Sequence, residues 1–195
     1  MSARVVVLPV RRPVVPSAVL GMLIFVTTEV MFFAGLISAF VIVESRSTVP
    51  WPPPGQPRLP IEATAVNTLA LLASGVAVLA AWRAFRREQP RSRVLLLAGL
   101  VLGAAFVTFQ GVEWVALIRE GLTLTVSPHA SFFYLIVGAH ALHAVGALIV
   151  LGRAYALLRS KRLAEPSLRA TAILWTFVVS VWPVLYALVY LRGVP

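Results

Sequence analysis

The sequence predicts an all-α integral membrane protein with five transmembrane helices in one bundle. Hydrophobic residues make up 59% of the 195 residues and charged residues only 12%, whereas about 25% of a typical soluble domain is charged. Five apolar runs are each long enough to cross a bilayer as a helix, which takes about 20 residues. The Lys and Arg residues fall between these runs, so the formal net charge of +10 indicates membrane topology and not nucleic-acid binding.

The first predicted span, residues 17–43, contains one charged residue, Glu29, near its middle. As a helix this run is about 40 Å long, at 1.5 Å per residue. A carboxylate at mid-membrane depth costs about 2.5–3.5 kcal/mol on insertion scales, so we expect a partner for Glu29 elsewhere in the chain. A cleaved signal peptide is not expected, because the run is too long and no small-residue cleavage site ends it.

A proline-rich loop and four more spans follow the first one. The loop, residues 44–63, holds six prolines between Pro50 and Pro60, which predicts a stiff, extended segment. Its Trp51 is expected to anchor at the membrane interface. Pro183 is expected to kink the last helix. The further spans are predicted at about residues 64–82, 94–118, 130–151 and 170–191. Residues 1–195 are thus expected to form a single membrane domain.

The distribution of basic residues predicts the orientation in the membrane. Thirteen of the 17 Lys and Arg residues lie in residues 1–16, 83–93 and 152–169. Loops rich in Lys and Arg stay in the cytoplasm. The N-terminus is therefore predicted to be cytoplasmic and the C-terminus to lie outside.

Four ionisable residues in the spans are predicted to form an intramembrane polar cluster: Glu29, Glu113, His140 and His143. His140 and His143 share one helix face because they are three residues apart. The predicted topology places both histidines and Glu29 near the membrane midplane and Glu113 nearer the outer face. We expect a Glu29 carboxyl oxygen to hydrogen-bond a ring nitrogen of His140 or His143, directly or through one water.

Three interpretations of these residues remain open at this stage. A metal or haem site is disfavoured, because two histidines one turn apart cannot clamp a haem from both faces, and the chain has no Cys for thiolate ligands. A proton path is the usual reason for carboxylates inside a membrane. The third interpretation is structural, with Glu and His holding helices together without any chemistry.

The third span carries a helix-packing motif. Gly99 and Gly103 are four residues apart, and such small-residue pairs let a second helix backbone approach closely. We therefore expect the third helix to contact a neighbour at these two positions.

Several short motifs occur in one order along the chain. They are residues 21–22 (GM), residues 28–35 (TEVMFFAG), the loop residues Trp51, Pro52, Pro53, Pro54 and Gly55, Glu62 with residues 67–68 (NT), residues 110–114 (QGVEW), residues 131–133 (SFF) and residues 138–143 (GAHALH). Together they cover nearly the whole chain and resemble the haem–copper oxidase subunit III family, in its short five-helix form.

The resemblance implies an accessory subunit of a bacterial haem–copper terminal oxidase in aerobic respiration, located in the inner (plasma) membrane. In that family the chain carries no haem or copper, which belong to subunits I and II. It packs mainly on subunit I, holds phospholipid in a cleft between helices, and supports proton uptake and sustained turnover. No catalytic, cofactor-binding or metal-binding residue is then expected here. The four ionisable residues would be structural, with a proton-buffering role.

Two departures from the family pattern stand out. Residues 175–179 read WTFVV where the family usually reads WHFVD, so Thr176 and Val179 replace a His and an Asp. The chain also has five predicted spans instead of the seven of the long form. The short form occurs in bacterial oxidases and in the small subunit associated with nitric oxide reductase. That subunit and a stand-alone proton-coupled transporter are the alternative functions.

Overall fold

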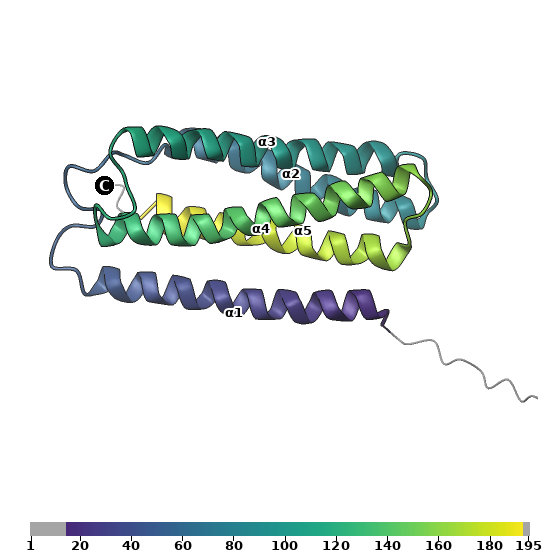
Figure 1. The fold of residues 1–195 in the computed structure, drawn as a ribbon, viewed down its shortest axis with the longest axis horizontal. Coiled ribbons are helices and arrows are strands. Elements are labelled where there is room, and N and C mark those ends of the chain that lie inside the picture. Colours follow the sequence, from purple (N-terminus) through teal and green to yellow (C-terminus); the bar gives the residue numbers. More distant parts are fainter. Residues whose placement is uncertain (1–14, 193–195) are drawn as a thin grey trace, which may run out of the picture.

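A computed structural model describes residues 15–192, and in this range the chain is helical with no β-strand (Figure 1). The helices are α1 (Ser17–Ser45), α2 (Ile61–Arg86), α3 (Ser92–Arg119), α4 (Pro128–Arg159) and α5 (Glu165–Leu185), the last continued by a π-helical turn (Tyr186–Tyr190). The basic residues before position 15, used above to predict orientation, and residues 193–195 lie outside the described residues.

Five transmembrane helices were predicted, and this is confirmed for the described residues. Each helix is long and apolar enough to cross a membrane, with a mean hydropathy of 1.8 to 2.1 over its most apolar window. Successive helices run in opposite directions. The α2–α3 and α4–α5 loops therefore lie at the same end of the molecule as the start of α1, which we call the basic end (Figure 1). Which side of the membrane this end faces stays a prediction.

Most helices extend beyond the predicted spans, chiefly at the basic end. α2 continues to Arg86 and α4 to Arg159, whereas hydropathy alone ended them near residues 82 and 151. Arginines lower the hydropathy of these last turns but do not break a helix. Their positive charges also interact favourably with the negative C-terminal end of the helix dipole.

The start of α4 shows why the preceding loop is shorter than predicted. Pro128 occupies the first turn, where its missing N–H is not needed, and Ser127 caps the helix by accepting a hydrogen bond from the Ala130 N–H (3.0 Å). Both residues were assigned to a loop from the sequence. The capping serine and the proline that follows it are the local signals that mark this helix start.

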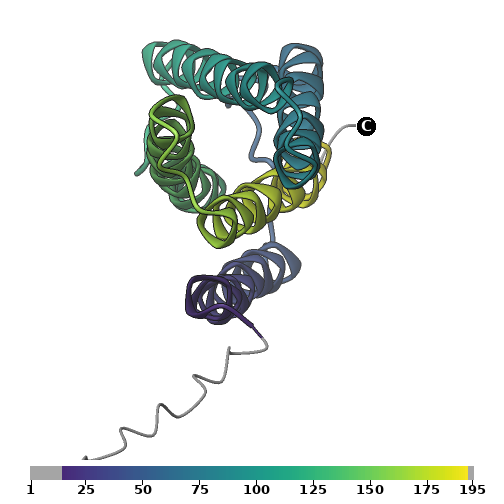
Figure 2. The same cartoon turned by 90° about the vertical axis from the view of Figure 1, so that its right-hand side faces the viewer.

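Helices α2, α3, α4 and α5 form a closed four-helix ring, and α1 lies outside it (Figure 2). α2 packs along α3 more extensively than any other pair, and α1 contacts α5 and, to a smaller extent, α4. Large aromatic side chains fill the centre of the ring. They are Phe106, Phe133, Trp175, Trp182 and Tyr190, all almost fully buried.

α1 is the least buried helix. Only Val19, Phe33 and Phe40 are buried on it. Apolar side chains that point away from the protein on a transmembrane helix can face lipid without cost, since lipid chains are as apolar as the side chains. The position of α1 therefore depends on a few specific contacts, described below.

The proline in α5 alters hydrogen bonding without ending the helix. Pro183 has no N–H to donate to the carbonyl of Val179. Shortly after it the chain changes from α-helical to π-helical hydrogen bonding over Tyr186–Tyr190. The buried side chains of Val189 and Tyr190 lie on this turn.

Candidate functional site

The partner of Glu29 is His143. Oε2 of Glu29 on α1 lies 2.7 Å from Nε2 of His143 on α4, which confirms the hydrogen bond expected between this carboxyl group and one of the two histidines. Both side chains are mostly buried, with 17% of Glu29 and 18% of His143 exposed. Phe33 packs edge-on against the imidazole with ring centroids 5.3 Å apart. The contact joins the outer helix to the four-helix ring in the apolar part of both helices.

The second ring nitrogen of His143 fixes how protons are arranged in this pair. Nδ1 lies 2.7 Å from the carbonyl oxygen of Ala139, which can only accept a hydrogen bond, so Nδ1 carries a hydrogen. The hydrogen bond between Nε2 and Glu29 then contains one further proton. That proton resides either on the carboxyl group of a neutral pair or on Nε2 of an ion pair. The geometry therefore holds one shared proton inside the membrane region.

His140 does not share this contact. It is 1% exposed, and no protein group within residues 15–192 hydrogen-bonds to either ring nitrogen. Its ring lies 5.1 Å from that of Trp182, at an interplanar angle of 32°, and 6.2 Å from that of Phe33. One side borders a cavity of about 210 Å³ between α3, α4 and α5, whose walls are almost entirely apolar. His140 is thus an imidazole in aromatic and aliphatic surroundings.

Glu113 belongs to a separate polar group. Its Oε2 accepts hydrogen bonds from Oγ1 of Thr64 on α2 (3.0 Å) and Nε2 of Gln110 on α3 (3.0 Å). The same Gln110 amide also donates to the Tyr190 hydroxyl oxygen at 3.0 Å. All four side chains are at most 8% exposed. This group connects α2, α3 and the π-helical turn after α5.

The four ionisable residues therefore occupy three places in the structure. Glu29 and His143 form one pair, His140 lies in the aromatic core, and Glu113 hydrogen-bonds with Thr64 and Gln110. They were grouped because all four are ionisable residues inside predicted spans, and similar depth was predicted for Glu29, His140 and His143 only. Depth does not fix which face of a helix a residue occupies, and α3 packs between α2 and α4 and not against α1.

A line of hydrogen bonds along α2 was not predicted from the sequence. The Trp175 N–H donates to Oγ of Ser74 (3.0 Å), and that hydroxyl donates to the carbonyl of Gly99 (2.6 Å). The Trp182 N–H donates to Oγ1 of Thr68 at 2.8 Å. A usable signal existed, because the two tryptophans are seven residues apart and so lie on one face of α5.

Both predicted packing glycines are at helix contacts. A Cβ built on Gly99 would lie 2.5 Å from Cγ2 of Val78 and 3.3 Å from the carbonyl of Ser74, which puts α2 directly against it. A Cβ on Gly103 would lie 2.5 Å from Trp175 of α5. Gly99 therefore lets the backbone of α2 come close, and Gly103 makes room for the indole ring of Trp175.

The proline-rich loop covers the end of the bundle opposite the basic end. Trp51 packs edge-on against His129 (5.3 Å) and Phe40 (5.8 Å), and Gln56 hydrogen-bonds to Ser127. Loop residues 50–59, including Pro52, Pro53, Pro54 and Gly55, border a cleft of about 520 Å³ with His129 and Tyr190. Trp51 was predicted to anchor in the membrane interface, and in the structure it contacts protein side chains.

Metal ligands do not gather anywhere in the described part of the chain. No group of three or more His, Cys, Asp or Glu side chains there is close enough to hold a metal ion. What the arrangement does offer is one shared proton, one isolated imidazole and a set of hydrogen bonds that join the helices.

Comparison with known proteins decides the family. The family profile described as cytochrome c oxidase subunit III matches residues 11–194. The chain belongs to the cytochrome c oxidase subunit III family. It is 31% identical over 176 residues to the probable cytochrome c oxidase subunit 3 of Nocardia farcinica, covering 87% of this chain and 85% of that one. It is 34% identical over 182 residues to cytochrome c oxidase subunit 3 of Triticum aestivum, covering 89% and 68%.

Two positions in α5 differ from the usual pattern of the subunit III family, and the structure shows what surrounds each of them. Thr176, in place of the usual His, lines a groove of about 440 Å³ between α1, α2 and α5, and its hydroxyl has no hydrogen-bond partner among the described residues. Val179, in place of the usual Asp, packs against α2, where a Cβ on Gly75 would lie 2.9 Å from its Cγ1. In this subunit III homologue Val179 is therefore a packing contact, whereas Thr176 borders a groove.

Proposed function

We propose that this chain is an accessory, cofactor-free subunit of a bacterial haem–copper terminal oxidase in aerobic respiration. The haem and copper of the complex would belong to subunits I and II. This chain would pack mainly on subunit I in the plasma membrane, hold phospholipid between its helices and support proton uptake during turnover. The observation that supports this most is the family match over residues 11–194, in a chain whose described polar residues join helices.

The Glu29–His143 pair is the feature of this chain that fits a role in proton supply. It keeps one proton between two groups on different helices, and the Ala139 carbonyl holds the imidazole in place. Such a pair can buffer a proton while it stabilises the contact between α1 and α4. Glu113 and His140 would have structural roles in the bundle.

The test is purification through a tag on this chain, in mild detergent, from the host membranes. The expected result is co-purification with larger subunits that show haem absorbance and reduce oxygen. A matched preparation from a strain that lacks this chain should keep its haem but lose activity after fewer turnovers. A haem-free homo-oligomer would instead support a transporter, and a complex that reduces nitric oxide but not oxygen would support the nitric oxide reductase alternative.

A further inference from the structure

The cleft of about 520 Å³ under the proline-rich loop lies at the end of the bundle opposite the basic end, which we call the loop end. Residues 50–59 border this proline cleft, together with His129 of α4 and Tyr190 of the π-helical turn. The loop residues lie beyond the membrane-spanning helices, since α1 ends at Ser45 and α4 begins at Pro128. The cleft therefore adjoins the membrane surface at the loop end, where a segment of another protein can reach it.

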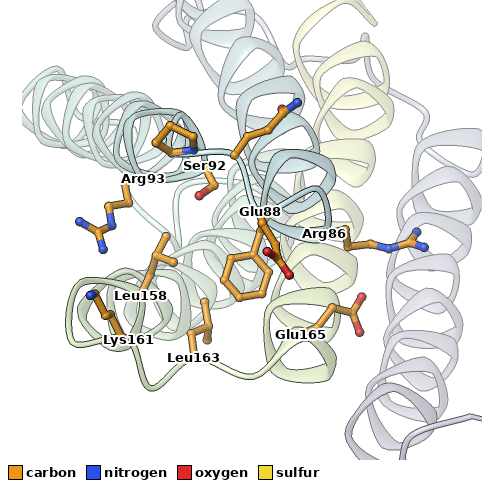
Figure 3. Close-up of a pocket in the computed structure, with 11 residues that line it drawn as sticks. Arg86, Glu88, Ser92, Arg93, Leu158, Lys161, Leu163 and Glu165 are labelled. Atoms are coloured by element: carbon orange, nitrogen blue, oxygen red, sulfur yellow. The ribbon is translucent and has the colours of Figure 1, made fainter.

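Charge distinguishes the proline cleft from the largest pocket at the basic end. That pocket, of about 1070 Å³, contains both acidic and basic side chains, among them Glu88 and Lys161 (Figure 3). The proline cleft is bordered by Arg58 and Arg192 and, within residues 15–192, by no carboxylate. Arg192 forms an ion pair with Glu44, whereas Arg58 is exposed and has no ion pair with any described residue. The charge of the proline cleft therefore favours an acidic occupant.

Three side chains that border the cleft have a polar atom without a hydrogen-bond partner among residues 15–192. These atoms are Nε1 of Trp51, Oε1 of Gln56 and Nδ1 of His129. His129 is only 3% exposed. The indole N–H can only donate a hydrogen bond, and the amide oxygen can only accept one. Because buried polar groups in native proteins are nearly always paired, the site calls for an occupant that brings both acceptors and donors.

A polypeptide backbone meets this requirement. It carries carbonyl oxygens and N–H groups in regular alternation, whereas an ionised phosphate group carries acceptors only. The loop's own backbone can supply few donors, because five of the residues from 50 to 57 are prolines. These prolines also stiffen the loop, so that it loses little conformational freedom when a segment binds to it.

We propose that the proline cleft binds an extended acidic segment of a partner protein. A carboxylate of that segment would pair with Arg58. One of its backbone carbonyls would accept the N–H of Trp51, and one of its backbone N–H groups would donate to the amide oxygen of Gln56. His129 would complete the site with a third hydrogen bond at Nδ1. The site requires only that another protein reaches the loop end, so it does not rest on the oxidase role proposed above.

Photocrosslinking in membranes of the host tests the proposal on the full-length chain. The photoreactive residue p-benzoylphenylalanine takes the place of Pro54, which is exposed and borders the cleft, and mass spectrometry identifies the crosslinked peptide. The expected adduct is one segment of another protein that contains Asp or Glu. The control has the same photoreactive residue in place of Leu124, which is 56% exposed at the loop end but does not border the cleft, and should not give this adduct.

A set of substitutions then tests how the segment is recognised. Arg58→Gln should lower the adduct yield about 2- to 5-fold, as expected for an exposed ion pair, and Arg58→Lys should retain the yield. Because Arg58 is exposed, neither change should disturb folding. Trp51→Phe keeps an aromatic ring but removes the N–H donor, and should lower the yield about 2- to 10-fold. Arg119→Gln removes the same charge at the same end, outside the cleft, and should leave the yield unchanged.

The other results of this experiment would overturn the proposal. Adducts with phospholipid alone would assign the cleft to lipid, and adducts with a second copy of this chain alone would assign it to an interface between copies. A crosslinked segment without Asp or Glu would contradict the charge argument, as would a yield that Arg58→Gln leaves unchanged. The absence of any protein adduct at position 54 would show that no partner segment binds there.

Discussion

Glu29 on α1 and His143 on α4 are joined by a hydrogen bond of 2.7 Å between Oε2 and Nε2. In the apolar part of the described chain, this contact between two ionisable side chains joins α1 to the four-helix ring. The Arg192–Glu44 ion pair lies at the end of α1, where both side chains are partly exposed. The Glu29–His143 pair therefore stabilises the position of α1 at a depth where the outer face of this helix touches only lipid or a partner protein.

A double-mutant cycle should show that the two residues are coupled. Glu29→Ala leaves Nε2 of His143 without its partner, and His143→Ala leaves the carboxyl group without its own, so each single change should cost about 1–3 kcal/mol of unfolding free energy. The double change should cost less than the sum, with a coupling of roughly 0.6–1.7 kcal/mol, the range for hydrogen bonds between transmembrane helices. Unfolding of the purified protein in mixed micelles measures all four species. Strictly additive effects would show that the contact contributes nothing.

Replacing each histidine by phenylalanine should separate their roles. His143→Phe removes the partner of Glu29 and should lower stability. His140→Phe should leave stability unchanged or raise it, because no group in residues 15–192 hydrogen-bonds to the His140 ring and the adjoining cavity of about 210 Å³ gives a larger ring room. Thermal unfolding of both variants in the same detergent gives the comparison. Destabilisation by His140→Phe as large as that by His143→Phe would reveal a polar partner of His140 outside this chain.

The number of helices and their approximate positions could be predicted because hydropathy over 20 residues is a strong signal. The ends could not, since Arg86 and Arg159 are helical although they are not apolar. Helix ends depend on caps and on the dipole, as the Ser127 cap of α4 shows. These local signals are visible in the sequence but do not raise hydropathy.

The candidate site was predictable only in part. The cost of an unpaired carboxylate inside a membrane required a partner for Glu29, and the pairing of two histidines on one face limited the choice to His140 or His143. Which of the two it is depends on the rotation of α4 about its axis, which the Phe33 and Trp182 rings fix by packing. Glu113 was grouped with them as a further ionisable residue inside a span, although it was placed nearer the outer face, and it hydrogen-bonds instead with Thr64 and Gln110.

The orientation of the bundle is tested by reporter fusions. An alkaline phosphatase fused after Arg192 should be active, because the C-terminal end is predicted to face the periplasm. The same reporter fused at Arg87, in the α2–α3 loop, should be inactive, and a fluorescent protein there should be bright. Moving two arginines from the basic end to residues 48 and 56, which are Thr and Gln, is the matched change in charge. The opposite activity pattern for the wild type would reverse the membrane side of every site described above.

The close approach of α2 and α3 leaves no room for a side chain at Gly99. Even alanine there would place its Cβ 2.5 Å from Cγ2 of Val78, which is fully buried, and 3.3 Å from the backbone oxygen of Ser74. Gly99→Ala should therefore cost about 1–3 kcal/mol of unfolding free energy through overpacking, and Gly99→Leu should block assembly. Gly103→Leu should also block assembly, because it displaces the Trp175 ring and with it the hydrogen bond from Trp175 to Ser74.

Gly111 on the same helix has nothing within 4 Å of a built Cβ, so Gly111→Ala is the control and should be neutral within about 0.5 kcal/mol. Equal stability of the Gly99→Ala and Gly111→Ala proteins would mean that α2 and α3 are farther apart in the membrane than the Ser74–Gly99 hydrogen bond of 2.6 Å requires.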